Sequence, residues 1–249
     1  MRDAERAARA IGAELLFASA GLGWVRSTEA VPSYGMTVAP GGDDNILARI
    51  DGDTSAASWW QWLTANSSFS ASLADIVNVT DGLVVVALPQ PYLVMVEADL
   101  LALPETVRPQ LRIIQRRGSV LESLAPWTLT YDDRLEGADD HAGTRSDFAA
   151  RAACHFVEQV LPGHEQGNVV AHDAAVQAAL SPWTARPVRI GERRSDDELR
   201  EIVAQHWEAA GGRTTRLLRI LRDDLGIACE QGRFARLVSA MRAERESTQ

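Results

Sequence analysis

The sequence predicts an α/β fold, a three-layer sandwich with a central, mostly parallel sheet, followed by a small C-terminal helical domain. Two short apolar runs, LLFA at residues 15–18 and GLVVVAL at 82–88, each end at a turn rich in Gly or Pro, as buried strands do. The composition changes to Pro, Arg and Gly near residue 182. We therefore expect an α/β domain over residues 1–181, a linker over 182–194 and a helix-turn-helix-like domain over 195–249.

All 25 basic residues are arginine, and the chain contains no lysine. This composition excludes a P-loop, whose lysine reaches the phosphates of a nucleotide. It also excludes enzymes that form a Schiff base on lysine, such as pyridoxal-phosphate enzymes. The charge is unevenly placed, since residues 189–249 carry twelve arginines against eleven carboxylates, whereas the whole chain has a net charge of −9. A relatively basic C-terminal part in an acidic protein suggests a polyanionic partner.

The N-terminal segment MRDAERAARAIGAELL has mixed charges and predicts a first helix, not a signal peptide. No run of eighteen apolar residues is present, so we expect no membrane span and a cytoplasmic protein. The two cysteines, Cys154 and Cys229, are too few for a disulfide framework and fit a reducing compartment. His164 and His172 are expected in a loop, without the spacing of metal ligands. We therefore expect neither a metal site nor a cofactor.

The first predicted strand, residues 15–18, leads into the small-residue turn SAGLG at 19–23. Such a turn lets backbone N–H groups approach a ligand closely, and an open α/β sheet binds its ligand at the carboxyl ends of its strands. VPSY at 31–34 then fixes an extended segment that presents one aromatic ring. We expect these segments to contribute Ser19, Gly21, Gly23 and Tyr34 to a pocket. The alternative is a strand followed by an ordinary tight turn.

Residues 46–53 (ILARIDGD) predict a strand edge and a turn, in which Asp51 and Asp53 alternate and face the same way. Two carboxylates in this arrangement are candidates for catalysis, although Asp-Gly-Asp is also common in turns. Asp53 or Thr54 is expected to cap a Trp-rich helix over residues 55–66. We expect one ring of this helix, that of Trp59, to line a pocket the size of a base or sugar. The alternative is a helix wedged between the sheet and a neighbouring element.

Residues 82–88 predict the clearest strand, β-branched, apolar on both faces and therefore central and parallel. Gln90 and Tyr92 follow it, ahead of a helix over 93–103, at the expected ligand rim. A Gln side chain can bind the edge of a nucleobase, and a Tyr side chain can stack on the base or donate a hydrogen bond to it. The alternative is that Tyr92 only packs against the start of the helix. A second short strand, residues 111–115, is flanked by arginines. Phosphate contact is expected from Arg112, Arg116 and Arg117, the alternative being a solvated strand edge.

Asp132 and Asp133, in the segment YDDR, are reserve candidates for a catalytic carboxylate. A helical pattern over 147–160 follows, with His155 expected as a core histidine. After the linker, helices are predicted over 196–210, capped by Ser195, and over 214–223 and 230–244. The last two fit a helix-turn-helix or form a helical cap on the α/β domain. In the first case, the residues expected to contact DNA are Arg213, Arg216, Arg219, Gln231, Arg233 and Arg236.

Four features in this order, SAGLGWV, VPSYGMT, a Trp-rich helix and LVVVALPQPYL, resemble the YaaA-like group. That group is similar in fold to uracil-DNA glycosylases and to a domain found with tRNA-guanine transglycosylases. The resemblance covers residues 13–156, and the C-terminal helices lie outside it. The group includes phage-defence DNA glycosylases that remove glucosylated cytosine, the activity that the resemblance implies. The chain lacks the His-Pro-Ser motif of uracil-DNA glycosylases, so neither their leaving-base histidine nor a catalytic acid is transferred by motif.

Hydrolysis of an N-glycosyl bond builds oxocarbenium character on the sugar, which a carboxylate stabilises, and leaves an anionic base that needs hydrogen-bond donors. From the resemblance we expect a monofunctional DNA glycosylase of anti-phage defence that flips out a modified base of phage DNA, best fitted by α-glucosyl-hydroxymethylcytosine, and leaves an abasic site. Its carboxylate is expected to be Asp51 or Asp53. Its pocket is expected to comprise Ser19, Gly21, Gly23, Tyr34, Trp59, Gln90 and Tyr92. A non-catalytic DNA-binding sensor and a nucleobase-exchanging transferase are the alternatives.

Overall fold

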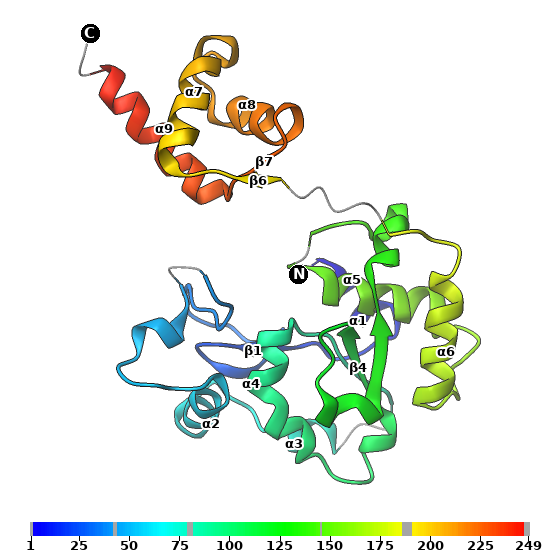
Figure 1. The fold of residues 1–249 in the computed structure, drawn as a ribbon. Helices are drawn as coiled ribbons and strands as arrows, with labels where there is room; N and C mark the ends of the chain where they lie inside the picture. The colour runs from blue at the N-terminus through cyan, green and yellow to red at the C-terminus, as the bar shows by residue number, and fades with distance from the viewer. Residues whose placement is uncertain (1, 42–43, 79–81, 145, 186–190, 247–249) are drawn as a thin grey trace. The chain divides into compact units, whose positions relative to one another are not determined.

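The computed structural model describes residues 2–41, 44–78, 82–144, 146–185 and 191–246. The chain folds into two compact units, Met1–Arg186 and Pro187–Gln249, and its structure is mixed α/β (Figure 1). Within the described ranges, no helix is long and apolar enough to cross a membrane. The first unit contains a small parallel sheet, and this sheet positions the candidate site.

Three parallel strands form the sheet: β3 (Val84–Val86), β4 (Leu111–Arg116) and β5 (Thr128–Tyr131), in the order β3-β4-β5. The prediction that the strand in residues 82–88 is parallel is confirmed. Its predicted central position is wrong, because β4 lies between the other two strands and is buried along its first five residues. The alternative of a solvated edge at 111–115 is wrong for the same reason. Whether a strand has one or two neighbouring strands depends on the topology of the chain, and the local hydrophobicity of the strand does not determine it.

The predicted first strand does not belong to this sheet. β1 (Leu16–Ser19) and β2 (Gly23–Arg26) form a separate antiparallel hairpin, in which Ser19 pairs with Gly23. A parallel neighbour needs a long crossover, and the SAGLG turn is too short to provide one. Glycine is required at position 23, because its φ is 91° and a Cβ there would lie 2.2 Å from the Oγ of Ser70.

Residues 46–49 form a short 3-10 helix, η1 (Ile46–Arg49), where a strand edge was expected. The side chain of Asn45 accepts the N–H of Leu47 at 3.0 Å and so favours a helical turn over an extended segment. The alternation that placed Asp51 and Asp53 on one strand face therefore does not apply. Ser55, instead of Asp53 or Thr54, caps helix α2 (Ala56–Asn66) by accepting the N–H of Ser58 at 3.0 Å.

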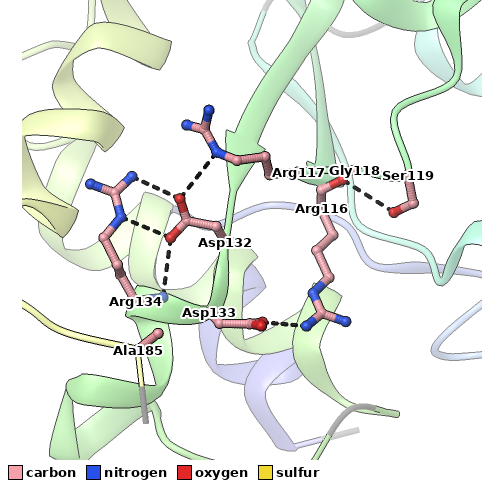
Figure 2. A pocket seen from close by; sticks show the side chains of 8 residues that line it. All are labelled: Arg116, Arg117, Gly118, Ser119, Asp132, Asp133, Arg134 and Ala185. Carbon is pink, nitrogen blue, oxygen red and sulfur yellow. Dashed lines mark hydrogen bonds and ion pairs between the residues drawn. The ribbon is translucent and has the colours of Figure 1, made fainter. Parts of the chain in front are cut away.

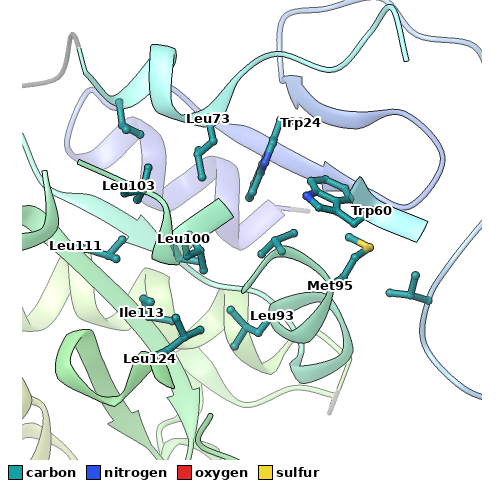
Figure 3. Close-up of a cluster of buried hydrophobic side chains, with 14 of the residues drawn as sticks. Trp24, Trp60, Leu73, Leu93, Met95, Leu100, Leu103, Leu111, Ile113 and Leu124 are labelled. Carbon is teal, nitrogen blue, oxygen red and sulfur yellow. The ribbon is translucent and has the colours of Figure 1, made fainter. Parts of the chain in front are cut away.

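The first hydrophobic core packs β3 and β4 against the hairpin and the helices that follow it, α2, α3 (Leu73–Val77) and α4 (Gln90–Leu101) (Figure 3). Trp24 and Trp60 meet edge to face at its centre, with ring centroids 5.4 Å apart. Both indole N–H groups donate to one oxygen of Asp99, at 2.7 Å from Trp24 and 2.8 Å from Trp60. Trp60 is completely buried, so α2 is a helix wedged into the core through this ring.

Replacement of Asp99 by leucine is expected to lower the free energy of unfolding by about 3 kcal/mol, because two indole N–H groups lose their acceptor inside the core. Asp99→Asn retains a carbonyl acceptor and is expected to cost less than half of this. Urea unfolding followed by tryptophan fluorescence measures both variants. Equal losses for the two variants would show that the hydrogen bonds do not stabilise this core.

The second core lies on the opposite face of the sheet, because successive residues of a strand point to opposite sides. Ile113 of β4 belongs to the first core, whereas Ile114 belongs to the second, with Leu129 and Tyr131 of β5. The helices that pack there are α1 (Arg2–Ala10), α5 (Phe148–His155), which continues as one π-helical turn at Phe156–Val160, and α6 (Val169–Leu180). Short 3-10 helices complete the connections: η2 (Arg108–Gln110), η3 (Glu122–Trp127), η4 (Asp133–Gly137) and η5 (Asp139–His141).

Helix α6 covers the outer edge of β5 with side-chain hydrogen bonds. The N–H of Thr130 donates to Asp173 at 2.6 Å, and the side-chain amide of Gln177 donates to the carbonyl of Thr130 at 2.6 Å. A strand edge satisfied in this way is not free to pair with another chain. His172 also lies in α6 and is buried, which corrects its expected place in a loop.

His155 is fully buried, as the prediction of a core histidine requires. Its Nδ1 lies 2.9 Å from the hydroxyl of Tyr131, and within the described chain its Nε2 has no hydrogen-bond partner. Burial, with a smaller contribution from His141, lowers the pKa of His155 from 6.5 to about 4. A charged imidazole is therefore disfavoured in the folded state.

Between pH 6.5 and 4 the unfolded chain binds a proton at His155 that the folded chain does not bind, so acidification destabilises the fold in this window. The expected loss is about 3 kcal/mol between pH 7 and 4. Urea midpoints measured across this range should fall for the natural protein and fall less for His155→Gln. His206→Gln, in the second unit, serves as the control. An unchanged pH dependence in His155→Gln would contradict the assignment.

The second unit has a core of its own, around Leu199, Leu217, Phe234 and Val238. Its helices are α7 (Asp196–Ala210), α8 (Thr214–Arg219), which continues as a π-helical turn at Ile220–Asp224, and α9 (Gln231–Glu246). Ser195 and Glu198 form a capping box at the start of α7, and Gly211 ends it with a φ of 60°. A two-residue parallel pairing joins β6 (Glu192–Arg193) to β7 (Ile227–Ala228). The predicted cap at Ser195 is confirmed.

Candidate functional site

A pocket lies where β4 and β5 end at the same edge of the sheet. Arg116, the last residue of β4, pairs with Tyr131, the last residue of β5, so the segments that follow both strands start side by side. The N–H of Arg117 donates to the carbonyl of Tyr131 at 2.7 Å and extends this alignment. The pocket has a volume of about 520 Å³ and is lined by Arg116, Arg117, Gly118, Ser119, Asp132, Asp133, Arg134 and Ala185 (Figure 2).

Asp132 accepts four hydrogen bonds from two arginines that line the pocket, Arg134 and Arg117 (Figure 2). It accepts from the guanidinium of Arg134 at 2.8 and 2.9 Å, from the N–H of Arg134 at 3.1 Å and from Arg117 at 3.2 Å. The hydrogen bonds from Arg134 lower the pKa of Asp132 and hold it ionised. With its oxygens occupied in this way, Asp132 positions two arginines and has little capacity left for a ligand.

Asp133 makes a single ion pair, through one carboxylate oxygen with Arg116 (Figure 2). Its side chain is 37% exposed and lines the pocket. The guanidinium of Arg116 also makes a cation–π contact, since it lies 5.5 Å from the ring centroid of Phe148. Asp133 is therefore a carboxylate that is oriented by Arg116 and whose second oxygen has no partner in the described part of the chain, the type of group that stabilises a developing positive charge.

Helix α6 positions the other arginines from outside the pocket. The side-chain oxygen of Gln177 accepts from Arg134 at 2.7 Å and from Arg117 at 3.1 Å. Gly118 has a φ of 85°, which turns the chain back directly after Arg117. The sequence indicated Arg116, Arg117, Asp132 and Asp133 as site residues, but not Arg134 or Gln177. The Asp-x-Arg spacing at 132–134 was a local signal for Arg134, whereas nothing local points to Gln177, 43 residues further along the chain.

Asp51 and Asp53, the preferred catalytic candidates, lie outside this pocket. Both are exposed in the irregular segment between η1 and α2. Neither side chain accepts a hydrogen bond from the described part of the chain, so nothing holds either carboxylate in a fixed orientation. This exposure favours the alternative of an ordinary Asp-Gly-Asp turn at these positions.

The predicted pocket around the SAGLG turn is partly assembled. The hydroxyls of Ser19 and Tyr34 are hydrogen-bonded, and the Tyr34 ring lies against Gly21, where a Cβ would be 3.0 Å from Cε2. The indole N–H of Trp59 donates to the carbonyl of Ala20 at 2.8 Å. Two of the N–H groups expected to bind a ligand are occupied, because the Ser19 hydroxyl accepts from Leu22 at 3.0 Å and from Gly21 at 3.4 Å. The turn is therefore a hairpin turn closed by its own serine.

The remaining predicted pocket residues are dispersed. Gly23 is buried against Ser70 and is not open to a ligand. Tyr92 packs against the first core, and its hydroxyl lies 3.1 Å from that of Thr37, which agrees with the alternative that it packs the start of a helix. Gln90 is exposed in the first turn of α4, which begins earlier than expected.

Arg112 is a structural residue, which corrects its predicted contact with phosphates. Its side chain is only 2% exposed. It donates to Nδ1 of His172 at 2.7 Å and to the carbonyls of Pro109, Leu111 and Gly167, each at 2.8 Å. His172 in turn lies 2.7 Å from the carbonyl of His164 through Nε2, so its Nδ1 is the acceptor. Burial lowers the pKa of Arg112.

The predicted DNA-contacting residues of the second unit divide into exposed and occupied groups. Arg233 is occupied, because its guanidinium bonds Asp196 at 2.6 and 2.8 Å and the carbonyl of Arg194 at 3.1 Å. The others are exposed on α8 and α9: Arg213, Arg216, Arg219, Gln231 and Arg236.

No group of three or more His, Cys, Asp or Glu side chains in the described ranges is arranged to hold a metal ion. Comparisons with protein-family models, with curated proteins and with solved structures find no match for this chain.

Proposed function

We propose that this protein binds DNA and hydrolyses the N-glycosyl bond of a modified base, with Asp133 as the catalytic carboxylate. The observation that carries the proposal is the pocket at the ends of β4 and β5, where Asp133 lies beside three guanidinium groups and, within the described chain, has one oxygen without a partner. A site that binds a DNA phosphate and stabilises a cationic sugar needs both kinds of charge within one cavity.

In this reaction the bond between C1′ and the base nitrogen breaks, and its electron pair leaves with the base. Asp133 stabilises the oxocarbenium character that develops on the sugar, as carboxylates do in glycoside hydrolysis. Water adds to C1′ and loses a proton, and the departing base gains one. Arg117 is 60% exposed, so its guanidinium can donate to the phosphate or to the leaving base. The product is an abasic site and a free base.

The proposal includes the finer features of the fold that the sequence suggests, a three-layer sandwich of the YaaA-like and uracil-DNA-glycosylase-like type and a helix-turn-helix in the second unit. The arrangement of the two cores on opposite sides of β4 supports the first feature. The resemblance of residues 13–156 supports the substrate class, a glucosylated cytosine in phage DNA. The absence of lysine supports a reaction that stops at the abasic site, because a Schiff-base lyase needs a lysine or another amine.

The test is incubation of the full-length protein with three DNA duplexes that contain cytosine, uracil or α-glucosyl-hydroxymethylcytosine. Mass spectrometry detects released base, and alkali converts abasic sites into strand breaks. We expect free glucosylated base and breaks that appear only after alkali. Intact DNA together with a clear binding shift would overturn the glycosylase proposal for these substrates and favour a non-catalytic DNA-binding protein. Release that requires an added free base would identify a transferase.

A further inference from the structure

The arginines whose side chains the structure describes in the second unit fall into two classes, those that bond another group of the unit and those without such a partner. Arg200 pairs with Glu244 at 3.0 Å, and Arg194 pairs with Glu192 at 2.7 Å and with Glu198 at 2.9 Å. Arg245 pairs with Glu208 at 3.5 Å and stacks 4.6 Å from the ring centroid of Trp207. Backbone carbonyls accept two further side chains: Arg222 bonds Cys229, and Arg242 bonds Gly212, each at 2.8 Å.

Three arginines of α8 behave differently. Arg213, Arg216 and Arg219 are exposed, and none of these side chains has a partner within the described chain. They recur every third residue, from the N-cap of α8 to its last residue, so they follow one side of the helix about 5–6 Å apart. Leu217, on the other side, is buried in the core of the unit. We call these three residues the α8 arginine row.

The α8 arginine row is unusual in a protein that has 34 carboxylates for 25 arginines. In the part of this unit that the structure describes, six arginine side chains bond a carboxylate or a backbone carbonyl, whereas these three adjacent ones do not. Like charges at helical spacing repel each other, so an unpaired row is unfavourable unless an external anion compensates it. A chain of phosphates is the anion that matches a linear row of guanidinium groups.

Helix α9 is less suited to contact DNA phosphates than the predicted helix-turn-helix would require. Arg233, the first arginine of α9, is bound to Asp196 and to the carbonyl of Arg194 and cannot reach DNA without losing both. This leaves Arg236 as the exposed cation in the first half of α9.

We propose that α8, through Arg213, Arg216 and Arg219, is the helix that contacts the phosphate backbone of DNA. This inference rests on the proposed function for the identity of its ligand. It predicts binding that depends strongly on salt and little on sequence, because phosphate contacts carry no base information. The second unit then anchors the protein on DNA, and specificity for the base resides in the first unit.

The experiment compares two triple variants of the full-length protein that lose the same charge. One is Arg213→Gln with Arg216→Gln and Arg219→Gln, and the matched control is Arg194→Gln with Arg200→Gln and Arg245→Gln. Affinity for a fluorescein-labelled 20-base-pair duplex and for the same single strand is measured by anisotropy at several KCl concentrations. Circular dichroism establishes that both variants keep the natural helix content.

For the duplex, we expect the slope of log K against log salt to decrease in magnitude by about 2.7 in the α8 variant, at about 0.9 per lost phosphate contact, and to stay unchanged in the control. Equal decreases in both variants would overturn the inference, since net charge alone would then govern binding. A decrease in Arg236→Gln with none in the α8 variant would overturn it in favour of α9.

Base release, scored on the same glucosylated duplex, separates this inference from the proposed function. Release by the natural protein, with an unchanged slope in the α8 variant, would overturn the role of α8 and leave the glycosylase proposal standing. A reduced slope without any released base would overturn the glycosylase proposal and leave α8 as the DNA contact.

Discussion

The Asp133→Asn variant is expected to release the modified base at least about 100-fold more slowly than the natural protein, at unchanged affinity for DNA. The substitution replaces a carboxylate by a neutral amide of the same shape, so it removes the charge that stabilises the cationic sugar. Because the side chain is 37% exposed and makes one ion pair, the fold should be retained. Single-turnover base release, with enzyme in excess over glucosylated duplex, isolates the chemical step from product release.

Asp51→Asn and Asp53→Asn provide matched controls, since both remove one carboxylate of the same unit at an exposed position. We expect both to keep the natural rate. A large loss of rate in either of them, with Asp133→Asn fully active, would return catalysis to the irregular segment before α2 and would show that the pocket between the ends of β4 and β5 has another role. Asp132→Asn is a less informative variant, because Asp132 holds Arg134 and Arg117 in place.

Replacement of Arg112 by methionine is expected to lower the free energy of unfolding by about 4 kcal/mol, the largest stability effect that we predict. Methionine fills much of the space of the arginine stem but donates no hydrogen bond. His172 and the carbonyl of Gly167 would lose their donor inside the protein, together with two carbonyls near the start of β4. Unsatisfied buried acceptors are costly because water cannot replace the lost donor.

Urea unfolding of Arg112→Met, followed by tryptophan fluorescence, measures this loss. Arg213→Met is the control, since it removes an exposed arginine without a partner in the described chain, and it should change the unfolding free energy by less than about 0.5 kcal/mol. If Arg112→Met were as stable as the control and instead bound DNA less tightly, Arg112 would be a phosphate contact, as its place in a run of arginines first suggested.

The contrast between Arg112 and Arg116 shows why the sequence predicts the residues of the site only in part. Arg112 and Arg116 lie on the same strand, and a cluster of arginines predicts phosphate contact for both. Arg112 is the second residue of β4, and its side chain donates to His172 of α6 and to the carbonyl of Gly167 just before that helix. Arg116 is the last residue of β4 and is directed into the pocket. Arg112 is buried because its side chain packs against the start of α6, whereas Arg116, at the end of the strand, lines the pocket. This difference depends on the tertiary structure.

Local signals in the sequence were sufficient for several elements. The capping box at Ser195 and the glycine at 211 define both ends of α7, because cap residues act through bonds to nearby backbone groups. The strands around residues 84–86 and 111–116 follow from short β-branched or apolar runs. The lysine-free composition determined by itself which covalent mechanisms are excluded.

Only the tertiary structure decided which carboxylate meets which arginine. Asp133 reaches Arg116, and Asp132 reaches Arg117, because the parallel register of β4 and β5 aligns the ends of two strands. Gln177 joins the same site from α6 because that helix covers the outer edge of β5. Hydrophobic periodicity and turn residues act over a few residues, whereas strand order and register depend on how the whole chain buries its apolar surface. The sequence therefore identified the groups able to perform the chemistry, and the packing of the chain selected which of them share a pocket.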